Sequence, residues 1–461
     1  MLAVLVATSP SAVAACPPRP PLGETIAINT HYGAPRETVD DAALVRLARA
    51  GVRWIRNDLD WATVERVPGV YDFETPRFDA LVESAECTGI HILFILDYGN
   101  PLYGPARAVV DDAGRQAFAA FAGAAAARYA GRGHAWEIWN EPNLPQFWSA
   151  PGSGPDPEVY GELVATTAPA IRAADPSAHI LIGSAFMAFP GVVAAIGGVP
   201  GIEFLDRLFA TGALAHADAV SAHFYRPEAP ETVAADVAAI RALMDAAGTT
   251  LPLWSGEWGY STYDPNAPPT GLNYLPAVTP ERQAAYVARM LLFNYELGLA
   301  GSVYFKDRDA AAPSPGNIEH HFGLMHDDLS SKPAYEAVAT LARLVGSARL
   351  RGRLRLGEEA HGLLFRHRAR RIVALWTERA ATWRLRSKLP TARVLARDGT
   401  DVTPAGLAQG TFVTLEPDQG PLYLLGPISV HPVTDVRARL RRDGAATRRS
   451  RARSGEWTRR K

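Results

Sequence analysis

The sequence predicts an α/β fold, a (β/α)8 TIM barrel followed by a small C-terminal antiparallel β-sandwich domain. Eight short apolar runs alternate with eight helical patterns over residues 24–346, and glycines lie just past four of those helices. Strand alternating with helix eight times is typical of a closed barrel of parallel strands. An open doubly wound sheet is the alternative. The count of eight and the lack of a glycine-rich phosphate loop after the first run disfavour it.

The elements of the expected barrel follow from this alternation. The expected strands are, in chain order, Thr25–Tyr32, Val52–Trp61, His91–Asp97, Ala135–Asn143, His179–Ser184, Ala219–Tyr225, Leu251–Ser261 and Gly301–Asp307. The expected helices are Val39–Ala50, Pro76–Cys87, Arg115–Tyr129, Pro157–Ala173, Gly201–Thr211, Glu231–Ala247, Pro280–Leu297 and Lys332–Val345. Gly51, Gly89, Gly248 and Gly298 stand just past four of these helices, where a left-handed cap favours glycine.

Residues 347–428 have a different pattern, in which short strand-like runs are divided by turn signals such as Asp398-Gly399. The runs are Arg351–Leu356, Gly362–Arg368, Ile372–Thr377, Thr382–Arg386, Ala392–Ala396, Thr411–Leu415 and Leu422–Leu425. Such a series is typical of an antiparallel β-sandwich, which we expect to pack on the barrel.

The N-terminal residues 1–15 have the apolar core and the small-residue end of a secretory signal, although no positive residue precedes the core. Residues 13–16 also resemble a lipobox, in which Cys16 would carry a lipid anchor. Only Cys16 and Cys87 are present, so they either pair in an oxidising compartment, or Cys16 carries lipid while Cys87 stays a buried thiol. Both alternatives remain open, and either predicts a secreted, periplasmic or lipid-anchored extracytoplasmic protein.

The net charge of −1 conceals an asymmetry. The segment 437–461 holds 11 Lys/Arg and 2 Asp/Glu, which leaves 36 basic and 46 acidic residues in the rest of the chain, a balance of −10. An acidic body argues against a nucleic-acid partner, whose footprint is a basic face. We expect the basic tail to be disordered, either solvated without a role or in contact with an acidic polysaccharide or a membrane surface.

An Asn-Glu pair ends the fourth run, in the sequence Ala135-Trp-Glu-Ile-Trp-Asn-Glu-Pro-Asn143. Strand alternation predicts that Glu137, Trp139 and Glu141 point one way. Pro142 cannot donate to a sheet ladder, so the strand should end there and present Asn140 and Glu141 at its C-terminal end. That end of a parallel barrel is where chemistry is placed.

A second acid ends the seventh run, where Gly256 and Gly259 flank the pair Glu257-Trp258. The glycines allow backbone and sugar to approach closely. Hydrolysis of a glycosidic bond needs one carboxylic acid to protonate the leaving oxygen and one carboxylate to attack or to activate water. Glu141 and Glu257 supply such a pair. The sequence contains no metal-ligand spacing and no nucleotide loop, and the proposed chemistry needs no cofactor and no metal.

These motifs resemble those of clan A retaining glycoside hydrolases, most closely family 39, with family 5 relatives possible. Further support comes from the run Ile55-Arg56-Asn57-Asp58, from His223-Phe224-Tyr225 and from the segment around Glu257. The resemblance implies an acid/base at the end of strand 4 and a nucleophile at the end of strand 7, the strands on which Glu141 and Glu257 fall by counting. It also implies a β-linked oligo- or polysaccharide as the substrate.

The resemblance also implies roles for the neighbouring residues. Glu257 must be ionised, so it needs neighbours that lower its pKa, and Arg56 and Tyr225 are the candidates. Alternatively, Arg56 forms a structural salt bridge at the barrel end, and Tyr225 is a core aromatic residue whose hydroxyl is hydrogen-bonded. Glu141 must be protonated, with a pKa raised by partial burial. Asn140 is expected to donate to the sugar 2-hydroxyl. His223 either lies near Glu141 or is a buried structural histidine.

Other residues at strand ends are candidates for the substrate cleft. The polar ones are His31, Asp58, Asp97, Tyr98 and Asn100, and the flat apolar ones are Trp61, Trp139, Trp148, Trp258 and Tyr304. The clan often carries a Trp on strand 8, whereas this chain offers Tyr304 or Phe305 there. Glu137 lies four residues before Glu141, which predicts a structural role near the other end of the barrel.

The sequence leaves three functions to compare. A retaining hydrolase predicts carboxyl groups about 5–5.5 Å apart, and an inverting one predicts about 6.5–9.5 Å. A carbohydrate-binding barrel with weak or no activity would require a broken carboxylate pair. The sugar, the linkage, and endo- versus exo-cleavage (as in a β-xylosidase-like enzyme) depend on loops, chiefly residues 97–104 and 258–275.

Overall fold

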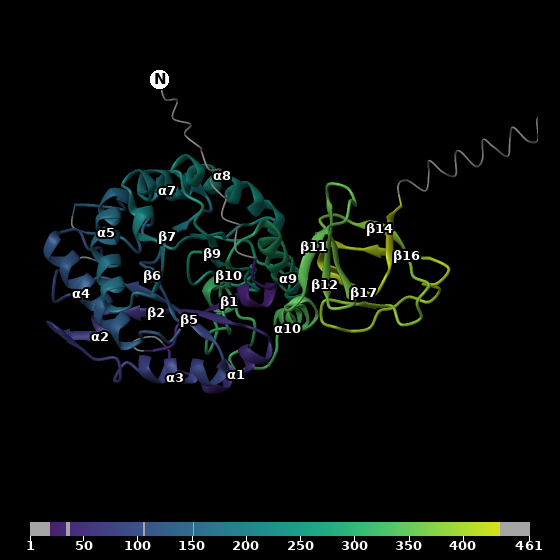
Figure 1. Ribbon diagram of the computed structural model, residues 1–461, viewed down its shortest axis with the longest axis horizontal. Coiled ribbons are helices and arrows are strands. Elements are labelled where there is room, and N and C mark those ends of the chain that lie inside the picture. Colours follow the sequence, from purple (N-terminus) through teal and green to yellow (C-terminus); the bar gives the residue numbers. More distant parts are fainter. Residues whose placement is uncertain (1–18, 34–36, 105–106, 151, 434–461) are drawn as a thin grey trace, which may run out of the picture.

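The computed structural model describes residues 19–33, 37–104, 107–150 and 152–433, and its larger part is a closed barrel of eight parallel strands (Figure 1). The strands are β1 (Ile26–Thr30), β2 (Trp54–Asp60), β5 (His91–Asp97), β6 (Ala135–Ile138), β7 (His179–Phe186), β8 (Ala219–His223), β9 (Leu253–Trp258) and β10 (Gly301–Tyr304). The first strand pairs with both β2 and β10, which closes the barrel and excludes the open sheet. The predicted (β/α)8 barrel is confirmed.

Eight helices follow the eight strands and cover the outside of the barrel, as Figure 1 shows. They are α1 (Asp41–Arg49), α3 (Phe78–Thr88), α4 (Asp112–Arg128), α5 (Pro157–Ala174), α7 (Gly201–Ala210), α8 (Val233–Ala246), α9 (Pro280–Leu297) and α10 (Pro333–Val345). Gly51, Gly89, Gly248 and Gly298 all have φ between 71° and 84°, the left-handed conformation expected of them.

The fourth strand ends earlier than the sequence predicts. It stops at Ile138, because Trp139 and Glu141 adopt left-handed φ values of 71° and 45°. The strict alternation expected up to residue 141 is therefore wrong beyond Ile138. Short elements that the sequence did not predict line the loops: α2 (Trp61–Val64), β3 (Glu65–Val67), β4 (Val70–Tyr71), α6 (Pro190–Ala195) and the 3-10 turns η1 (Leu22–Thr25), η2 (Ala213–His216), η3 (Pro230–Thr232), η4 (Ile318–His320) and η5 (Pro417–Gln419).

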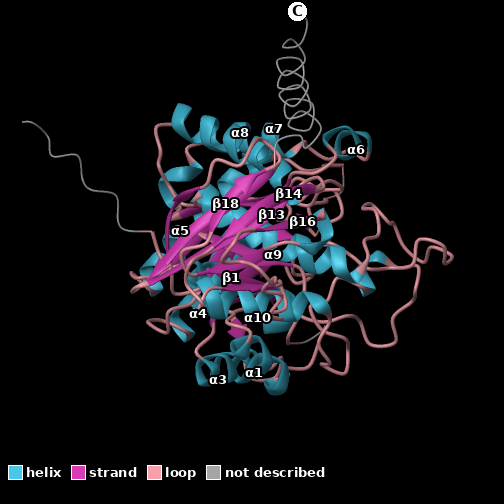
Figure 2. Ribbon diagram, turned by 90° about the vertical axis from the view of Figure 1, so that its right-hand side faces the viewer, coloured by secondary structure: helices cyan, strands magenta, loops and turns pink. Residues whose placement is uncertain are grey.

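The C-terminal region consists of two antiparallel sheets (Figure 2). The five-stranded sheet has the order β11 (Arg349–Arg353), β12 (Ala360–His367), β13 (Arg370–Thr377), β17 (Leu422–Leu425), β15 (Arg393–Leu395), and the three-stranded sheet has the order β16 (Thr411–Leu415), β14 (Ala381–Arg386), β18 (Ser429–Pro432). Val373 and Leu375 of β13 pack with Trp383 and Leu385 of β14 in one apolar cluster, as expected of a sandwich.

The other face of β13 packs toward the barrel, because Ile372, Ala374 and Trp376 belong to the main core. Figure 1 shows α9 and α10 between the barrel and the C-terminal sheets. A buried ion pair lies at this junction: Arg289 of α9 binds Glu231, which also accepts a hydrogen bond from Trp376 Nε1 at 2.7 Å. The sheets are therefore anchored to the barrel by polar as well as apolar contacts.

The expected N-terminal signal (residues 1–15), Cys16 and the basic tail (437–461) lie outside the described residues. Cys87, at the end of α3, is exposed, so the expectation of a buried thiol there is wrong. Among the helices of the described part of the chain, none combines the length and the apolar character needed to span a bilayer.

Candidate active site

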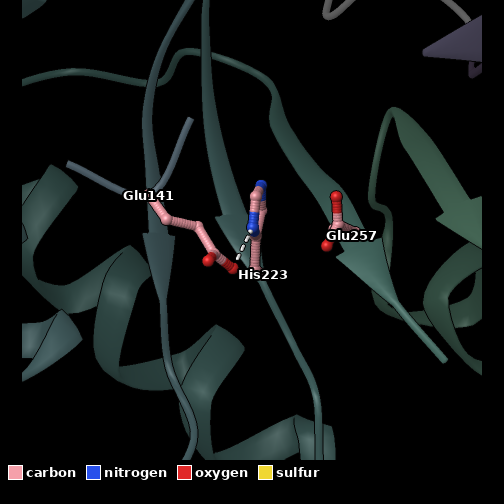
Figure 3. A group of neighbouring side chains, drawn as sticks. All are labelled: Glu141, His223 and Glu257. Atoms are coloured by element: carbon pink, nitrogen blue, oxygen red, sulfur yellow. Dashed lines mark hydrogen bonds and ion pairs between the residues drawn. The ribbon is translucent and has the colours of Figure 1, made fainter. Parts of the chain in front are cut away.

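A cavity of about 430 Å³ opens at the C-terminal edge of the barrel strands, and both predicted carboxylates line it. Glu141 follows β6 and Glu257 lies within β9, the fourth and seventh strands of the barrel. One carboxylate oxygen of each lies within 4.8 Å of the other. Residues separated by 116 positions in the chain thus come together at one cavity, and Figure 3 shows them on either side of His223.

Glu141 is brought into the cavity by the left-handed turn that ends β6. Its Oε1 lies 2.8 Å from Nδ1 of the fully buried His223 (Figure 3). The other ring nitrogen, Nε2, lies 3.3 Å from Arg56 Nη2, and a guanidinium can only donate. Nε2 must therefore accept, so Nδ1 carries the hydrogen and donates it to Glu141. Burial and the charge of Arg56 lower the pKa of His223 well below its ordinary value, which agrees with a neutral ring.

Glu257 sits at a bulge in β9. His223 pairs with Glu257 and Ala222 with Ser255, so Gly256 is an extra residue on this strand. A Cβ on Gly256 would come within 2.0 Å of Ser221 Oγ, so the glycine serves strand packing rather than the approach of a sugar. The carboxylate of Glu257 accepts hydrogen bonds from Arg56 Nη1 at 2.6 Å and from the Tyr225 hydroxyl at 2.7 Å.

Arg56, on β2, is buried beneath the cavity with all five of its N–H groups engaged. Nε donates to Glu137 at 2.5 Å; Nη1 donates to Asn29 Oδ1 and Glu257; Nη2 donates to Asn140 Oδ1 and His223. The expectation that Glu137 lies near the other end of the barrel is wrong, because Glu137 binds the same guanidinium as Glu257. Oε1 of Glu137 accepts a hydrogen bond from the Ser184 hydroxyl, so Glu137 is itself held in place and helps to orient Arg56.

Comparison with known proteins agrees with this arrangement. The family model for cellulase (glycosyl hydrolase family 5) matches residues 19–285, more than half of the chain and most of the barrel. The chain belongs to glycosyl hydrolase family 5. It is therefore an O-glycosyl hydrolase, as the sequence predicted, and family 5 is the relative that the resemblance had left possible. None of the curated proteins compared with this family 5 chain matches it.

Solved structures share the fold of this family 5 chain. A family 39 glycoside hydrolase from Bacteroides cellulosilyticus WH2 is 23% identical, with a TM-score of 0.68 over 89% of this chain and 83% of that one. A glucosidase from Croceicoccus marinus is 17% identical (TM-score 0.58, 90% and 97% covered), and a family 30 endoxylanase from Clostridium papyrosolvens C71 is 10% identical (TM-score 0.56, 87% and 96% covered). The clan A fold is thus confirmed, with a likeness to family 39 in architecture.

The two carboxyl groups differ in their tendency to ionise. Burial, and then the charge of Glu257, raise the pKa of Glu141 well above its ordinary value. Burial also raises the pKa of Glu257, but Arg56 and the Tyr225 hydroxyl oppose it there. The expected lowering at Glu257 is therefore outweighed by burial. The pair shares one cavity, and the carboxyl that loses its proton first is Glu257, the one with two direct donors.

Four further predicted residues of the family 5 chain line the cavity. His31 Nδ1 lies 2.7 Å from Asp58 Oδ2, and the pair stands at the ends of β1 and β2. Asn140 accepts a hydrogen bond from Arg56 at its Oδ1 and donates one from Nδ2 to the Tyr98 hydroxyl at 3.1 Å. All four line the same cavity as Glu257, where a sugar ring needs hydrogen-bonding partners.

Several aromatic residues predicted to stack on sugars do not reach the cavity. Trp139 packs outside the strands against Phe118 of α4, because the left-handed turn rotates it away from Glu141. Trp258 donates from Nε1 to Ser302 Oγ at 3.0 Å, and the Tyr304 hydroxyl donates to Phe322 O at 2.6 Å. Those expectations are wrong for Trp139, Trp258 and Tyr304. On strand 8, Phe305 lines the cavity, the other residue considered there.

The remaining predicted residues also lie away from the cavity lining. Trp61 and Trp148 are fully buried among aromatic residues of the barrel wall, and Asn100 is tied to the carbonyl of Glu65 at 2.8 Å. Asp97 is fully buried, and at the end of β5 Tyr98 lines the cavity instead. His223 is likewise buried, and its Nδ1 contacts Glu141 rather than the cavity. Contact with substrate is therefore wrong for Asp97 and for His223.

The structure adds residues to the site that the sequence analysis did not single out. Glu319 of η4 and Tyr274 reach the cavity from the loops after β10 and β9, and apolar side chains from the loops after β6 and β7 form one of its walls. Tyr274 falls within the predicted specificity loop 258–275. Glu319 carried no local signal, because it follows strand 8 by 15 positions in a long irregular loop.

One cluster of the described residues has the ligand types of a metal site: Glu141, His223 and Glu257. The contacts already present account for each of them. His223 uses Nδ1 for Glu141 and Nε2 for Arg56, and the guanidinium supplies the positive charge beside Glu257. A cation bound there would have to break these contacts and lie next to Arg56. The arrangement therefore fits acid–base and nucleophilic chemistry better than metal binding.

Proposed function

We propose that this family 5 protein is a retaining glycoside hydrolase that cleaves β-glycosidic bonds by double displacement. The observation that carries the proposal is the separation of the two acids, with one oxygen of Glu141 within 4.8 Å of one oxygen of Glu257. Retaining enzymes place their carboxyl groups about 5–5.5 Å apart, whereas inverting enzymes need room for a water molecule between acid and base. The narrow gap supports the retaining mechanism over the inverting one.

In the first step, the Glu257 carboxylate attacks the anomeric carbon. The bond from that carbon to the leaving oxygen breaks, and Glu141 gives its proton to that oxygen. Since His223 donates to Oε1 of Glu141, Oε2 is the oxygen left to carry the proton. In the second step, Glu141 as carboxylate takes a proton from water. The water oxygen bonds to the anomeric carbon, and Glu257 leaves.

The surrounding residues serve these two steps. Arg56 and Tyr225 hold Glu257 ionised and aimed. Asn140 uses one N–H for Tyr98, which leaves its second N–H to donate to a sugar hydroxyl close to Glu257. This supports the expected contact with the 2-hydroxyl, which strengthens as positive charge develops on the ring. His223 is a positioning residue, because it acts through Glu141 without touching the sugar.

The alternative of a carbohydrate-binding barrel without turnover is less well supported. Two carboxyl groups buried together cost folding free energy, since burial raises the pKa of both. A protein that only binds sugar would gain by replacing one of them. Catalysis explains why both carboxyl groups are present and held by hydrogen bonds from His223, Arg56 and Tyr225.

The direct test is kinetic rescue of Glu257→Ala. We expect this variant to lose turnover of an aryl β-glycoside and to regain it with added azide, which yields the α-glycosyl azide because attack occurs once. The matched control is Glu228→Ala, an exposed glutamate just after β8 at the same barrel edge, which should keep full activity. Near-normal turnover of Glu257→Ala without azide would contradict the assignment.

We also propose that the enzyme is exported. The signal-like residues 1–15 and the lipobox-like residues before Cys16 support this. Sequencing the mature N-terminus and measuring its mass distinguishes a free secreted form from a lipid-modified Cys16. An unprocessed N-terminus recovered with the cytoplasmic fraction would contradict export.

A further inference from the structure

The two sides of the active-site cavity differ in chemical character. The side near Glu257 carries His31, Asp58 and Asn140, from β1, β2 and the end of β6. The opposite side is built by the loops after β6 and β7 and is apolar: Leu144, Phe147, Phe186, Phe189 and Val193. All five belong to one apolar cluster at the barrel mouth, which continues to Tyr225 and Phe305, and Phe147 also packs against the main core. A wall of this kind offers van der Waals contact but few hydrogen-bond partners.

The apolar side is the one that receives the leaving group. Glu141 gives its proton to the leaving oxygen, so the group beyond that oxygen extends past Glu141, away from Glu257. Leu144 and Phe147 belong to the same loop as Glu141, and Leu144 N donates to Glu141 O at 3.0 Å. Among the described residues lining the cavity, the polar ones beside this wall are Gln146, Tyr274, whose ring packs against Phe186, and Tyr98, whose ring stacks on Phe147. A departing sugar would bury several hydroxyl groups here with little to bond them.

The apolar side continues outward as a lip of exposed side chains. Val192 of α6 is 58% exposed, Ile196 just after it is 46% exposed, and Leu272, from the loop after β9, is 77% exposed. All three line the same cavity. Large apolar side chains gathered at the rim of a site, rather than scattered over the surface, indicate a ligand that covers them.

The part of this lip that comes from α6 is fixed to the Glu141 loop by hydrogen bonds. The fully buried Asn143, two residues after Glu141, donates from Nδ2 to Phe186 O and Val199 O, each at 3.0 Å. Its Oδ1 accepts from Phe186 N at 2.9 Å, and its carbonyl accepts from Val199 N at 3.0 Å. The bonds join the Glu141 loop to both ends of the segment that carries α6, so Val192 and Ile196 are held in one position relative to the acid.

We propose that the group released by this enzyme is apolar: the substrate is a β-glycoside whose aglycone is an alkyl or aryl group rather than a further sugar. The proposal rests on the assignment of Glu141 as the acid, since that assignment decides on which side the aglycone lies. The bonds made and broken are those of the double displacement, and the released product is an alcohol or a phenol. Binding energy comes from burying the aglycone against the wall and the lip.

The test compares substrates that share one glycone and differ in the leaving group. A panel of 4-nitrophenyl β-glycosides first identifies the glycone that is turned over fastest. The butyl, hexyl and octyl β-glycosides of that sugar then have nearly equal leaving-group chemistry, so their kcat/KM values report binding of the chain. We expect kcat/KM to rise about fourfold for each added methylene, the factor that corresponds to burying one methylene group. The matching β-linked disaccharide should be at least about a hundredfold slower than the octyl glycoside.

Dodecyl, phenyl and naphthyl glycosides distinguish a long alkyl aglycone from an aromatic one. A rise that continues to the dodecyl glycoside indicates a lipid-like chain lying along the lip, and a preference for naphthyl over phenyl at similar acidity indicates a compact aromatic aglycone. Equal kcat/KM across the alkyl series, or faster turnover of the disaccharide, overturns the inference while leaving the hydrolase assignment intact. Alkyl-glycoside turnover that survives Glu257→Ala overturns the hydrolase assignment instead.

Substitution of the lip gives an independent readout. In Val192→Ser/Leu272→Ser, we expect the octyl-to-butyl ratio of kcat/KM to fall about tenfold. The matched control is Val67→Ser/Leu389→Ser, whose side chains are 58% and 50% exposed and do not line the cavity, and it should keep the wild-type ratio. All four positions are exposed, so neither variant removes core packing. An unchanged ratio in the lip variant contradicts the proposal.

Discussion

Two buried arginine–glutamate clusters, one beneath the active site and one at the junction with the C-terminal sheets, are built from the same groups and behave differently. Arg289 and Glu231 form a closed bidentate pair, with Nε–Oε1 at 2.9 Å and Nη2–Oε2 at 2.5 Å. Although burial acts to raise the pKa of Glu231, the bonds from Arg289 outweigh it and lower that pKa. Arg56 instead divides its donors among five residues, and the pKa of Glu257 stays raised.

The difference shows how one ion-pair chemistry serves either stability or reaction. Glu231 uses both oxygens for the Arg289 fork and for Trp376, so its charge is fully compensated. Glu257 receives one bond from Arg56 and one from Tyr225 while its carboxylate still faces the cavity. A carboxylate that is held but not fully compensated remains able to attack. Four predictions test this comparison, in order of decreasing effect.

Replacing the two glutamates should separate activity from structure. Glu257→Gln removes the proposed nucleophile, so kcat on an aryl β-glycoside should fall by about four orders of magnitude or more, as when other covalent nucleophiles are lost. Glu231→Gln should leave kcat within about twofold, because Glu231 lies at the junction and not in the cavity. Steady-state kinetics of both purified variants measures this. A comparable loss of kcat in both variants would contradict the comparison.

Breaking the closed pair should affect stability. Arg289→Met leaves Glu231 buried without its partner, which typically costs about 3–5 kcal/mol. Thermal and urea unfolding monitored by circular dichroism should show this loss, while kcat of the folded fraction stays near wild type. In Arg289→Met/Glu231→Leu, both charges are gone, and we expect much of the stability to return. If the double variant is as unstable as the single one, the cost lies in packing and not in the unpaired charge.

Weakening the open cluster should change the pH dependence of catalysis. Arg56→Lys keeps a positive charge but loses the fork that reaches Glu137, Glu257 and Asn140 together. We expect kcat/KM to fall by about a hundredfold, roughly 2.7 kcal/mol of transition-state stabilisation. Because Arg56 lowers the pKa of Glu257, its loss should also move the acidic limb of the kcat/KM profile to higher pH. An unshifted acidic limb would show that Arg56 does not control this ionisation.

The smallest expected effect is the change in the free energy of unfolding when Glu141 or Glu231 is replaced by glutamine. The folded pKa of Glu141 is raised above 4.5, so the folded state holds a proton that the unfolded state releases, and stability falls as pH rises through that window. Glu141→Gln avoids this loss and should be more stable than wild type at pH 7, with no gain at pH 4. The folded pKa of Glu231 is lowered, which stabilises the protein above the unfolded pKa, so Glu231→Gln should lose stability at pH 7. Melting temperatures at both pH values measure the two signs, and equal signs would contradict the argument.

The sequence by itself determined the barrel and the two acids. The eightfold alternation, the four glycines in left-handed caps, and the positions of Glu141 and Glu257 on the fourth and seventh strands are all local patterns. Parallel strands of a closed barrel end at one rim, so residues at two strand ends must meet there. The polar group of His31, Asp58, Asn140 and Tyr98 follows from the same rule.

Only the tertiary structure decided which way the side chains beyond the strand ends point. The left-handed turn at Trp139, the bulge at Gly256 and the five-donor use of Arg56 depart from simple alternation, and they moved Trp139, Trp258 and Glu137 from their expected places. The apolar wall is likewise formed by two loops that Asn143 ties together across the barrel mouth. The hydrophobic periodicity of the sequence predicts which face of a single strand or helix is buried. The walls of a cavity instead depend on contacts between loops that are distant in the chain.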